Sequence, residues 1–189
     1  IYYPAKDAIF YSADVHGNQI TGERLRCISR IINHSSTGEG VLTVVTTMDG
    51  IADRLIPVER FKEAVITLDY SSEIEPEKLA KKLVAMGFGR TGRVEDKGQF
   101  AIRGGIIDSF SYTDEAPVRI ELWDTEVDSI RMFDVESQRS IERLQSYSIF
   151  PATEYIFTED ELKNGLYNIK KECDRQLECF DYGKRKRTK

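Results

Sequence analysis

The stretch from Gly98 to Arg143 constrains the fold most, because its segments repeat the pattern of β-strands. Polar and apolar residues alternate through QFAIR, VRIELW and VDSIRMF, with the period of two that half-buried strands show. The pair Gly104-Gly105 and the run Asp124-Thr125-Glu126 supply turn chemistry between the segments. The predicted strands are 100–103, 106–110, 118–123 and 127–133. The pattern therefore indicates an antiparallel meander, which we interpret as a recognition surface built on a sheet.

Arginines recur along this predicted sheet, and two explanations for them remain open. Arg103, Arg119 and Arg131 lie within it, and Arg90 and Arg93 lie just before it. A guanidinium can pair with a carboxylate of another protein, since arginine is favoured in interfaces. It can equally pair with a carboxylate of the same sheet. The carboxylates available are Glu95, Asp96, Asp108 and Glu121. From spacing alone we favour the local pairing.

The sequence divides into three predicted parts, covering residues 1–47, 48–150 and 151–189. In the first, a strand ending at IYYP precedes a helix at 23–32, a loop at 33–40 (NHSSTGEG) and the apolar run VLTVVT. Such a run is typical of a buried strand, and a parallel one fits the strand-helix-strand order. This part is too short to be a whole nucleotide-binding fold.

The second and third parts contain further helices. In the second part, a short helix at 57–64 and the strand AVITLDY are predicted first. An amphipathic helix at 76–86 follows, with Leu79, Leu83 and Val84 on its apolar face and Gly87 at its end. Together with the meander they predict a small inserted α+β domain. In the third, Thr158 and Glu161 form a capping-box pattern before a helix at 159–180. The basic tail at 184–189 is expected to be solvated and disordered.

Composition excludes several classes of protein. The net charge of −5 argues against a dedicated nucleic-acid binder, which normally has a basic excess. No apolar run approaches the roughly 18 residues of a membrane span, so we expect no membrane association. No signal-peptide pattern is present, and Cys27, Cys173 and Cys179 lack metal-binding spacing, which fits a reduced cytoplasmic compartment.

The chain carries no recognisable catalytic motif. The glycine clusters STGEG and RGGIID both precede strands, whereas a phosphate loop precedes a helix whose N-terminus holds the phosphate. His16 and His34 lack metal-ligand spacing, and the paired carboxylates are expected to be solvated. Trp123 is expected to be a core residue rather than a stacking platform. We therefore predict no catalytic residue, cofactor or metal in this chain.

The phrases FAIRGGIIDSF, PVRIELWDTEVDSIRMFD and ESQRS, in this order, resemble the UvrB-homology module of transcription-repair coupling factors, the Mfd family. The resemblance extends from IYYPAKDAIFYSADVHGNQITGERL to SIFPATEYIF. It implies a UvrB interaction domain at 48–150. Partial α/β elements of a degenerate P-loop NTPase type would then flank it at 1–47 and 151–189. It also implies a bacterial cytoplasmic protein.

The resemblance further implies function. The small domain of this family binds UvrA, the damage-recognition ATPase, to recruit nucleotide excision repair to stalled RNA polymerase. The matching positions for that contact are Arg90 and Arg103, with Phe110 as a candidate apolar anchor. UvrB has a second arginine two residues before the position of Arg103. This chain has Ala101 there, so the full contact pattern of UvrB is not carried over. ATP with Mg, DNA and RNA polymerase would belong to other parts of the parent translocase.

UvrB, the excision-repair helicase subunit, is the alternative, with its catalytic P-loop outside this chain. UvrB has a long aromatic-rich β-hairpin before the helix that corresponds to 23–32. The path from Tyr3 to Glu23 is too short for such a hairpin and lacks its tyrosine cluster. ESQRS also matches the coupling factors where UvrB has a threonine-glycine phrase. We therefore prefer the coupling factors.

Overall fold

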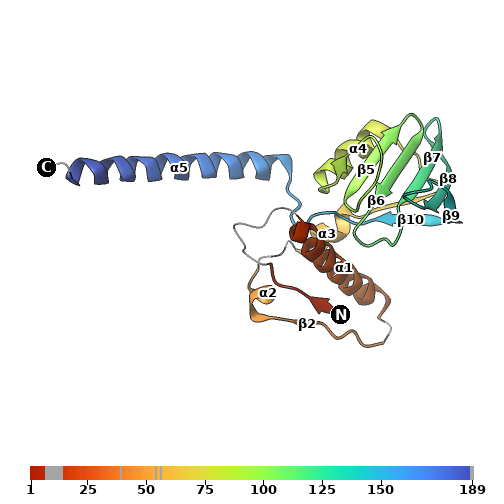
Figure 1. The fold of residues 1–189 in the computed structure, drawn as a ribbon, viewed down its shortest axis with the longest axis horizontal. Coiled ribbons are helices and arrows are strands. Elements are labelled where there is room, and N and C mark those ends of the chain that lie inside the picture. The colour runs from red at the N-terminus through yellow and green to blue at the C-terminus, as the bar shows by residue number, and fades with distance from the viewer. Residues whose placement is uncertain (7–14, 39, 54, 56, 188–189) are drawn as a thin grey trace. The chain divides into compact units, whose positions relative to one another are not determined.

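The computed structural model describes residues 1–6, 15–38, 40–53, 55 and 57–187. The chain forms two compact units, Ile1–Ile156 and Phe157–Lys189. The first unit contains all the strands and the helices α1 to α4, and the second contains the single helix α5 (Figure 1). Each unit is described by itself below.

The first unit begins with a strand-helix-strand arrangement. Strand β1 (Tyr2–Tyr3) pairs in parallel with β2 (Val45–Thr46), and α1 (Val15–Thr37) connects them. The parallel pairing follows the prediction. The helix, however, continues through residues 33–37, which we had expected to be loop, and there Ser36 and Thr37 donate side-chain hydrogen bonds to carbonyls one turn earlier.

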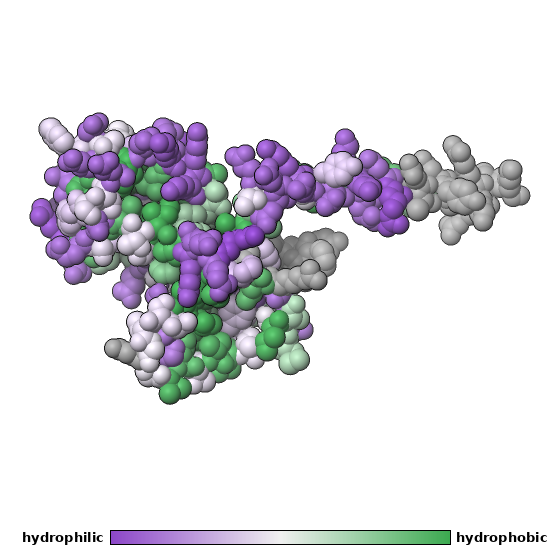
Figure 2. Space-filling model, turned by 180° about the vertical axis from the view of Figure 1, so that it is seen from behind, coloured by the Kyte–Doolittle hydropathy of each residue, from purple (hydrophilic) through white to green (hydrophobic). Residues whose placement is uncertain are grey.

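The prediction of a buried strand at VLTVVT is wrong. Only two of its residues form β2, and its valines are exposed, Val41 to 95%. Figure 2 shows apolar surface gathered over the part of the first unit formed by β1, β2, α1 and α2 (Met48–Ala52). Its exposed members include Tyr2, Val41, Val44, Val45, Met48 and Ile51. Hydrophobic character therefore identified this segment without determining whether a neighbour covers it.

The main sheet of the first unit has six strands in the order β4-β5-β6-β7-β8-β9. The strands are β4 (Gly89–Arg90), β5 (Gln99–Arg103), β6 (Ile106–Phe110), β7 (Val118–Trp123), β8 (Glu126–Phe133) and β9 (Ser140–Arg143). All neighbours are antiparallel except β4 and β5, which are parallel. The predicted meander is confirmed, and the structure adds the two edge strands.

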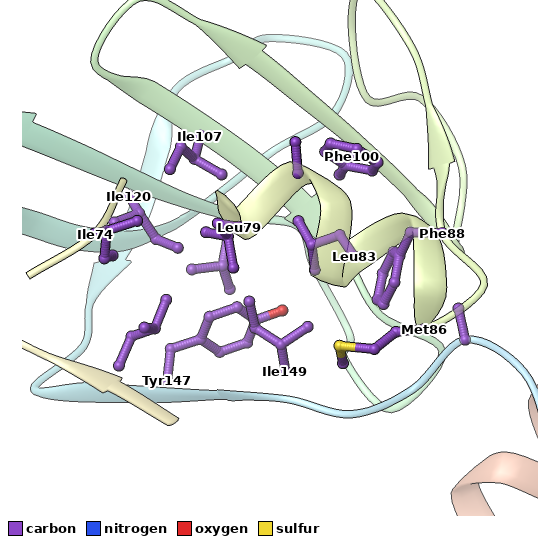
Figure 3. Close-up of a cluster of buried hydrophobic side chains, with 14 of the residues drawn as sticks. Ile74, Leu79, Leu83, Met86, Phe88, Phe100, Ile107, Ile120, Tyr147 and Ile149 are labelled. Carbon is purple, nitrogen blue, oxygen red and sulfur yellow. The ribbon is translucent and has the colours of Figure 1, made fainter. Parts of the chain in front are cut away.

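Helix α4 (Pro76–Ala85) covers one face of this sheet. Leu79 and Leu83 pack into the same buried cluster as Phe100 and Ile107 of the sheet (Figure 3). Val84, which we had placed on the apolar face, is 55% exposed, and Ala80 is buried instead. The helix ends before Gly87, as predicted, and Gly87 has a φ of +88°. The Gly87 amide donates to the Val84 carbonyl and the Phe88 amide donates to the Leu83 carbonyl, which together form a Schellman-type cap.

A second, two-stranded sheet closes the small domain. After α3 (Val58–Ala64), strand β3 (Ile66–Asp69) pairs antiparallel with β10 (Ser146–Ile149). Tyr147 and Ile149 of β10 extend the core under α4 (Figure 3). The phenol of Tyr147 donates a 2.5 Å hydrogen bond to Asp114. The strands at the start and at the end of the domain share one buried core with the main sheet.

The second unit contains α5 (Glu159–Arg187). The predicted capping box is present, since the Glu161 amide donates to the Thr158 hydroxyl and the Thr158 amide donates to the Glu161 carboxylate. The helix extends past the predicted end at Phe180. Residues 184–187 are helical, contrary to the expected disorder, whereas 188–189 lie outside the described residues.

Candidate functional site: a charged face of the main sheet

The two faces of the main sheet differ in character, because side chains alternate along each strand. Phe100, Ile107 and Ile120 point to the face that α4 covers, where they are buried. The residues between them carry charge on the other face. We call this set the arginine face: Arg103, Asp108, Arg119, Glu121 and Arg131. Strand pairing aligns Asp108 with Arg119 and Arg119 with Arg131, so three strands contribute one charged row.

Two arginines share one buried carboxylate at the centre of the arginine face. Arg119 binds Asp108 through two nitrogens, at 2.7 and 2.9 Å, and Arg103 adds one hydrogen bond of 2.5 Å to the same carboxylate. The Asp108 side chain is 1% exposed, and the Arg103 side chain is 45% exposed. Hydrogen bonding to Asp108 raises the pKa of Arg119, against the opposing effect of burial.

The charge at this centre is unbalanced. One carboxylate faces two guanidinium groups, and the bidentate Arg119 already satisfies both of its oxygens. Arg103 uses one of its five N–H donors on Asp108. The local pairing that the sequence favoured is therefore present, yet it leaves Arg103 with positive charge and spare donors toward solvent.

In a second ion pair on the arginine face, the positive and negative charges cancel more nearly. Arg131 and the Ser129 hydroxyl both donate to the Glu121 carboxylate. Burial alone would raise the pKa of Glu121, but these hydrogen bonds lower it below its usual value. Glu121 therefore stays ionised and neutralises Arg131, so among the five residues of the arginine face the excess positive charge lies at the Asp108 centre, on Arg119 and Arg103.

Arg90 lies on the opposite face from Arg103. It pairs with Phe100 across the parallel strands and forms a 3.6 Å ion pair with Glu77 of α4. Arg103 is three residues after Phe100 on the same strand, so it points the other way. The two arginines that the resemblance implies for one contact therefore point to opposite faces of the sheet, because strand register, not sequence proximity, sets their direction. Both side chains are exposed.

Phe110, the candidate apolar anchor, is 7% exposed. It forms a small cluster with Val94, Ala101 and Val135, and the Lys97 ammonium lies 5.0 Å from the centre of its ring. We assign Phe110 a packing role, since its ring supports the sheet beside the arginine face.

The prediction that Trp123 is a core residue is wrong, because its side chain is 81% exposed. The alternation along β7 could have indicated this. Val118 and Ile120 are buried, whereas Arg119 and Glu121 point to the arginine face, and Trp123 continues the latter series. Sequence reasoning also missed Gln138, whose side-chain oxygen accepts a 3.0 Å hydrogen bond from Arg119.

Among the residues that the structure describes, no group of three or more His, Cys, Asp or Glu could hold a metal ion. Across that same part of the chain, no helix has the length and apolar character to cross a membrane.

The fold and the charged face define a small α+β domain, and comparison with known proteins shows which family it is similar to. The family model of the UvrB interaction domain matches residues 66–155, from the start of β3 to just beyond β10. Residues 66–155 are therefore similar to the UvrB interaction domain, in agreement with the resemblance noted in the sequence.

The chain as a whole is similar to transcription-repair-coupling factors. It is 41% identical to that of Bacillus subtilis over 169 residues, which are 89% of this chain and 14% of the relative. It is 36% identical to that of Staphylococcus aureus strain MRSA252 over 182 residues, which are 93% of this chain and 15% of the relative. The chain thus spans about a seventh of the length of these relatives.

Proposed function

We propose that this chain is the docking segment of a transcription-repair-coupling factor and that its arginine face binds UvrA. The observation that carries the proposal is the sharing of buried Asp108 by Arg119 and Arg103, which leaves Arg103 partly unneutralised on an accessible face. A charged donor held by strand geometry suits a carboxylate of a partner protein. The family of residues 66–155 supports the choice of UvrA as that partner.

The chain acts in this proposal as a recruiting module without catalysis of its own. ATP-driven movement, contact with DNA and contact with RNA polymerase would reside in other parts of the parent protein. The similarity to coupling factors at 36–41% identity favours this parent over UvrB, the alternative.

Calorimetric titration of the 189-residue chain with purified UvrA tests the proposal. Replacing Arg103 with Ala should weaken binding more than tenfold, since truncating one charged interface contact costs about 2–5 kcal/mol and about 1.4 kcal/mol is tenfold. Arg30→Ala, which removes an exposed arginine of α1 outside the matched domain, is the control and should bind normally.

A melting curve for each variant separates binding from folding. Arg119 keeps two hydrogen bonds to Asp108 when Arg103 is removed, so Arg103→Ala should melt close to the unsubstituted chain. Failure of the unsubstituted chain to bind UvrA, or unchanged affinity in folded Arg103→Ala, contradicts the proposal.

A further inference from the structure

The exposed Trp123 stands at the end of the arginine face where Arg103 lies. Two hairpin turns meet there, Gly104-Gly105 between β5 and β6, and Asp124-Thr125 between β7 and β8. The pairing of Ile106 with Glu121 places these turns side by side. The pairing of β7 with β8 shifts register between Glu121 and Leu122, but Leu122 still packs against the buried core. Its neighbour Trp123 therefore leaves the opposite face, which is that of Glu121 and Arg103.

The backbone beneath Trp123 is firmly held. The Leu122 amide donates a 2.8 Å hydrogen bond to the Gly105 carbonyl, and a Cβ at Gly105 would lie only 2.9 Å from the Leu122 carbonyl oxygen. On the other side, the Ile74 amide donates 2.7 Å to the carbonyl of Thr125. Trp123 is thus an exposed ring on a fixed backbone, so a partner would order little more than the side chain itself.

The indole contributes little to the core of the folded chain. At 81% exposure it is the most exposed of the aromatic side chains whose burial the structure describes. Tryptophan and arginine are the residues most enriched where interfaces concentrate their binding energy. An apolar ring on the same face as a partly unneutralised guanidinium, two strands away, therefore matches one kind of surface, an apolar pocket with a carboxylate near it.

We infer that Trp123 is the apolar anchor of the docking surface and inserts into an apolar pocket of the partner, beside the carboxylate that Arg103 contacts. This inference rests on the proposed function, because its partner is the UvrA of that proposal. It assigns to Trp123 the anchoring role that the sequence had suggested for Phe110, whose ring is buried.

The chain contains one tryptophan, which allows a direct test. Incorporating 5-fluorotryptophan places a single fluorine probe at position 123, and unlabelled UvrA adds no signal of its own. Titration followed by fluorine NMR should show a shifted or broadened resonance and protection from a soluble paramagnetic agent. Calorimetry on unlabelled variants should show that Trp123→Ala weakens binding about tenfold or more, while Trp123→Phe retains most of the affinity.

The matched control is Val84→Ala, which truncates an exposed apolar residue on α4, on the other side of the sheet, and should bind normally. Melting curves should show that Trp123→Ala remains folded. If the unsubstituted chain binds UvrA but the fluorine signal stays accessible and folded Trp123→Ala binds equally well, the anchor is refuted and the proposed function stands. If the unsubstituted chain does not bind UvrA, both fail.

Discussion

Arg24 and Glu154 lie 130 positions apart in the chain and form a buried, bidentate ion pair. The two guanidinium nitrogens donate to the two carboxylate oxygens at 2.7 and 2.9 Å. Arg24 is fully buried, and it also donates to the carbonyl of Pro4 and pairs with Asp53 at 3.1 Å. This one side chain therefore ties α1 to β1, to the residues after α2 and to the segment that follows the small domain.

Glu154→Ala should destabilise the chain strongly. Among the described residues it leaves the buried Arg24 with Asp53 as its remaining charged partner, and removing one member of a buried pair costs about 3–5 kcal/mol. For a chain of this size that loss lowers the melting temperature by about 6–20 °C. Differential scanning calorimetry measures it.

The double variant Arg24→Leu with Glu154→Leu is the matched control for this pair. Replacing both charges with apolar groups removes the unpaired guanidinium, so its stability should recover above that of Glu154→Ala. A double variant less stable than Glu154→Ala would show that the pair contributes more than mutual neutralisation.

Tyr3, beside this pair, should make folding sensitive to alkaline pH. Burial, followed by the nearby Glu154 carboxylate, raises the pKa of Tyr3 to about 12 from its ordinary 10.0. Because the folded-state pKa lies above the unfolded one, the stability contribution is complete below pH 10 and is lost as pH rises from 10 to 12. Denaturant unfolding at stepped pH should reveal this loss.

Tyr3→Phe is the control for the alkaline effect. Among the residues that the structure describes, the Tyr3 hydroxyl has no hydrogen-bond partner, so phenylalanine should remove the titration without removing a hydrogen bond. Burial also raises the pKa values of Tyr112 and Tyr147, which remain in both proteins. Identical pH profiles for the two proteins would show that Tyr3 does not contribute.

Asp108→Asn should destabilise the small domain. It keeps the shape of the buried side chain but removes the charge that Arg119 and Arg103 share. Since Arg119 retains some solvent exposure, we expect a loss of about 2–3 kcal/mol in the free energy of unfolding, below that of a fully buried pair. Urea unfolding followed by circular dichroism measures it, and a loss no larger than that of Arg103→Ala would contradict the central role of Asp108.

Arg90 and Arg103 should act independently on UvrA binding, because they point to opposite faces of the sheet. Arg90→Ala should weaken binding less than Arg103→Ala, and the two effects should add within about 0.5 kcal/mol, as distant sites do. A double-mutant cycle by calorimetric titration measures this. Strong coupling between the two would indicate that one partner group contacts both side chains.

The sheet was predictable because several local signals agreed. Alternation through QFAIR and VRIELW, the glycine pair at 104–105 and the turn at Asp124, whose φ is +58°, all favour the same hairpins. The cap at Gly87 was predictable for a similar reason, since a positive φ at a helix end favours glycine.

Relations between distant segments were not predictable in the same way. Nothing near Arg24 in the sequence indicates that Glu154 is its partner, and nothing near Val41 indicates that its neighbours leave it exposed. For the candidate site, too, local features were predictable and contacts between distant residues were not. Its arginines were visible as residue types, but the sharing of Asp108, the opposite direction of Arg90 and the exposure of Trp123 depend on strand register.

The pairing of β3 with β10 has a consequence for how such a domain spreads among proteins. Ile66 lies opposite Ile149, and Asp69 opposite Ser146, so the chain enters and leaves the domain at neighbouring positions. A receiving protein needs to open only one surface loop to accept a unit whose ends are adjacent. The same geometry would let residues 66–155 be inserted at one loop of an unrelated carrier protein, provided that the carrier supplies apolar contacts in place of Leu25, Ile32 and Phe61, which share the buried cluster of the domain.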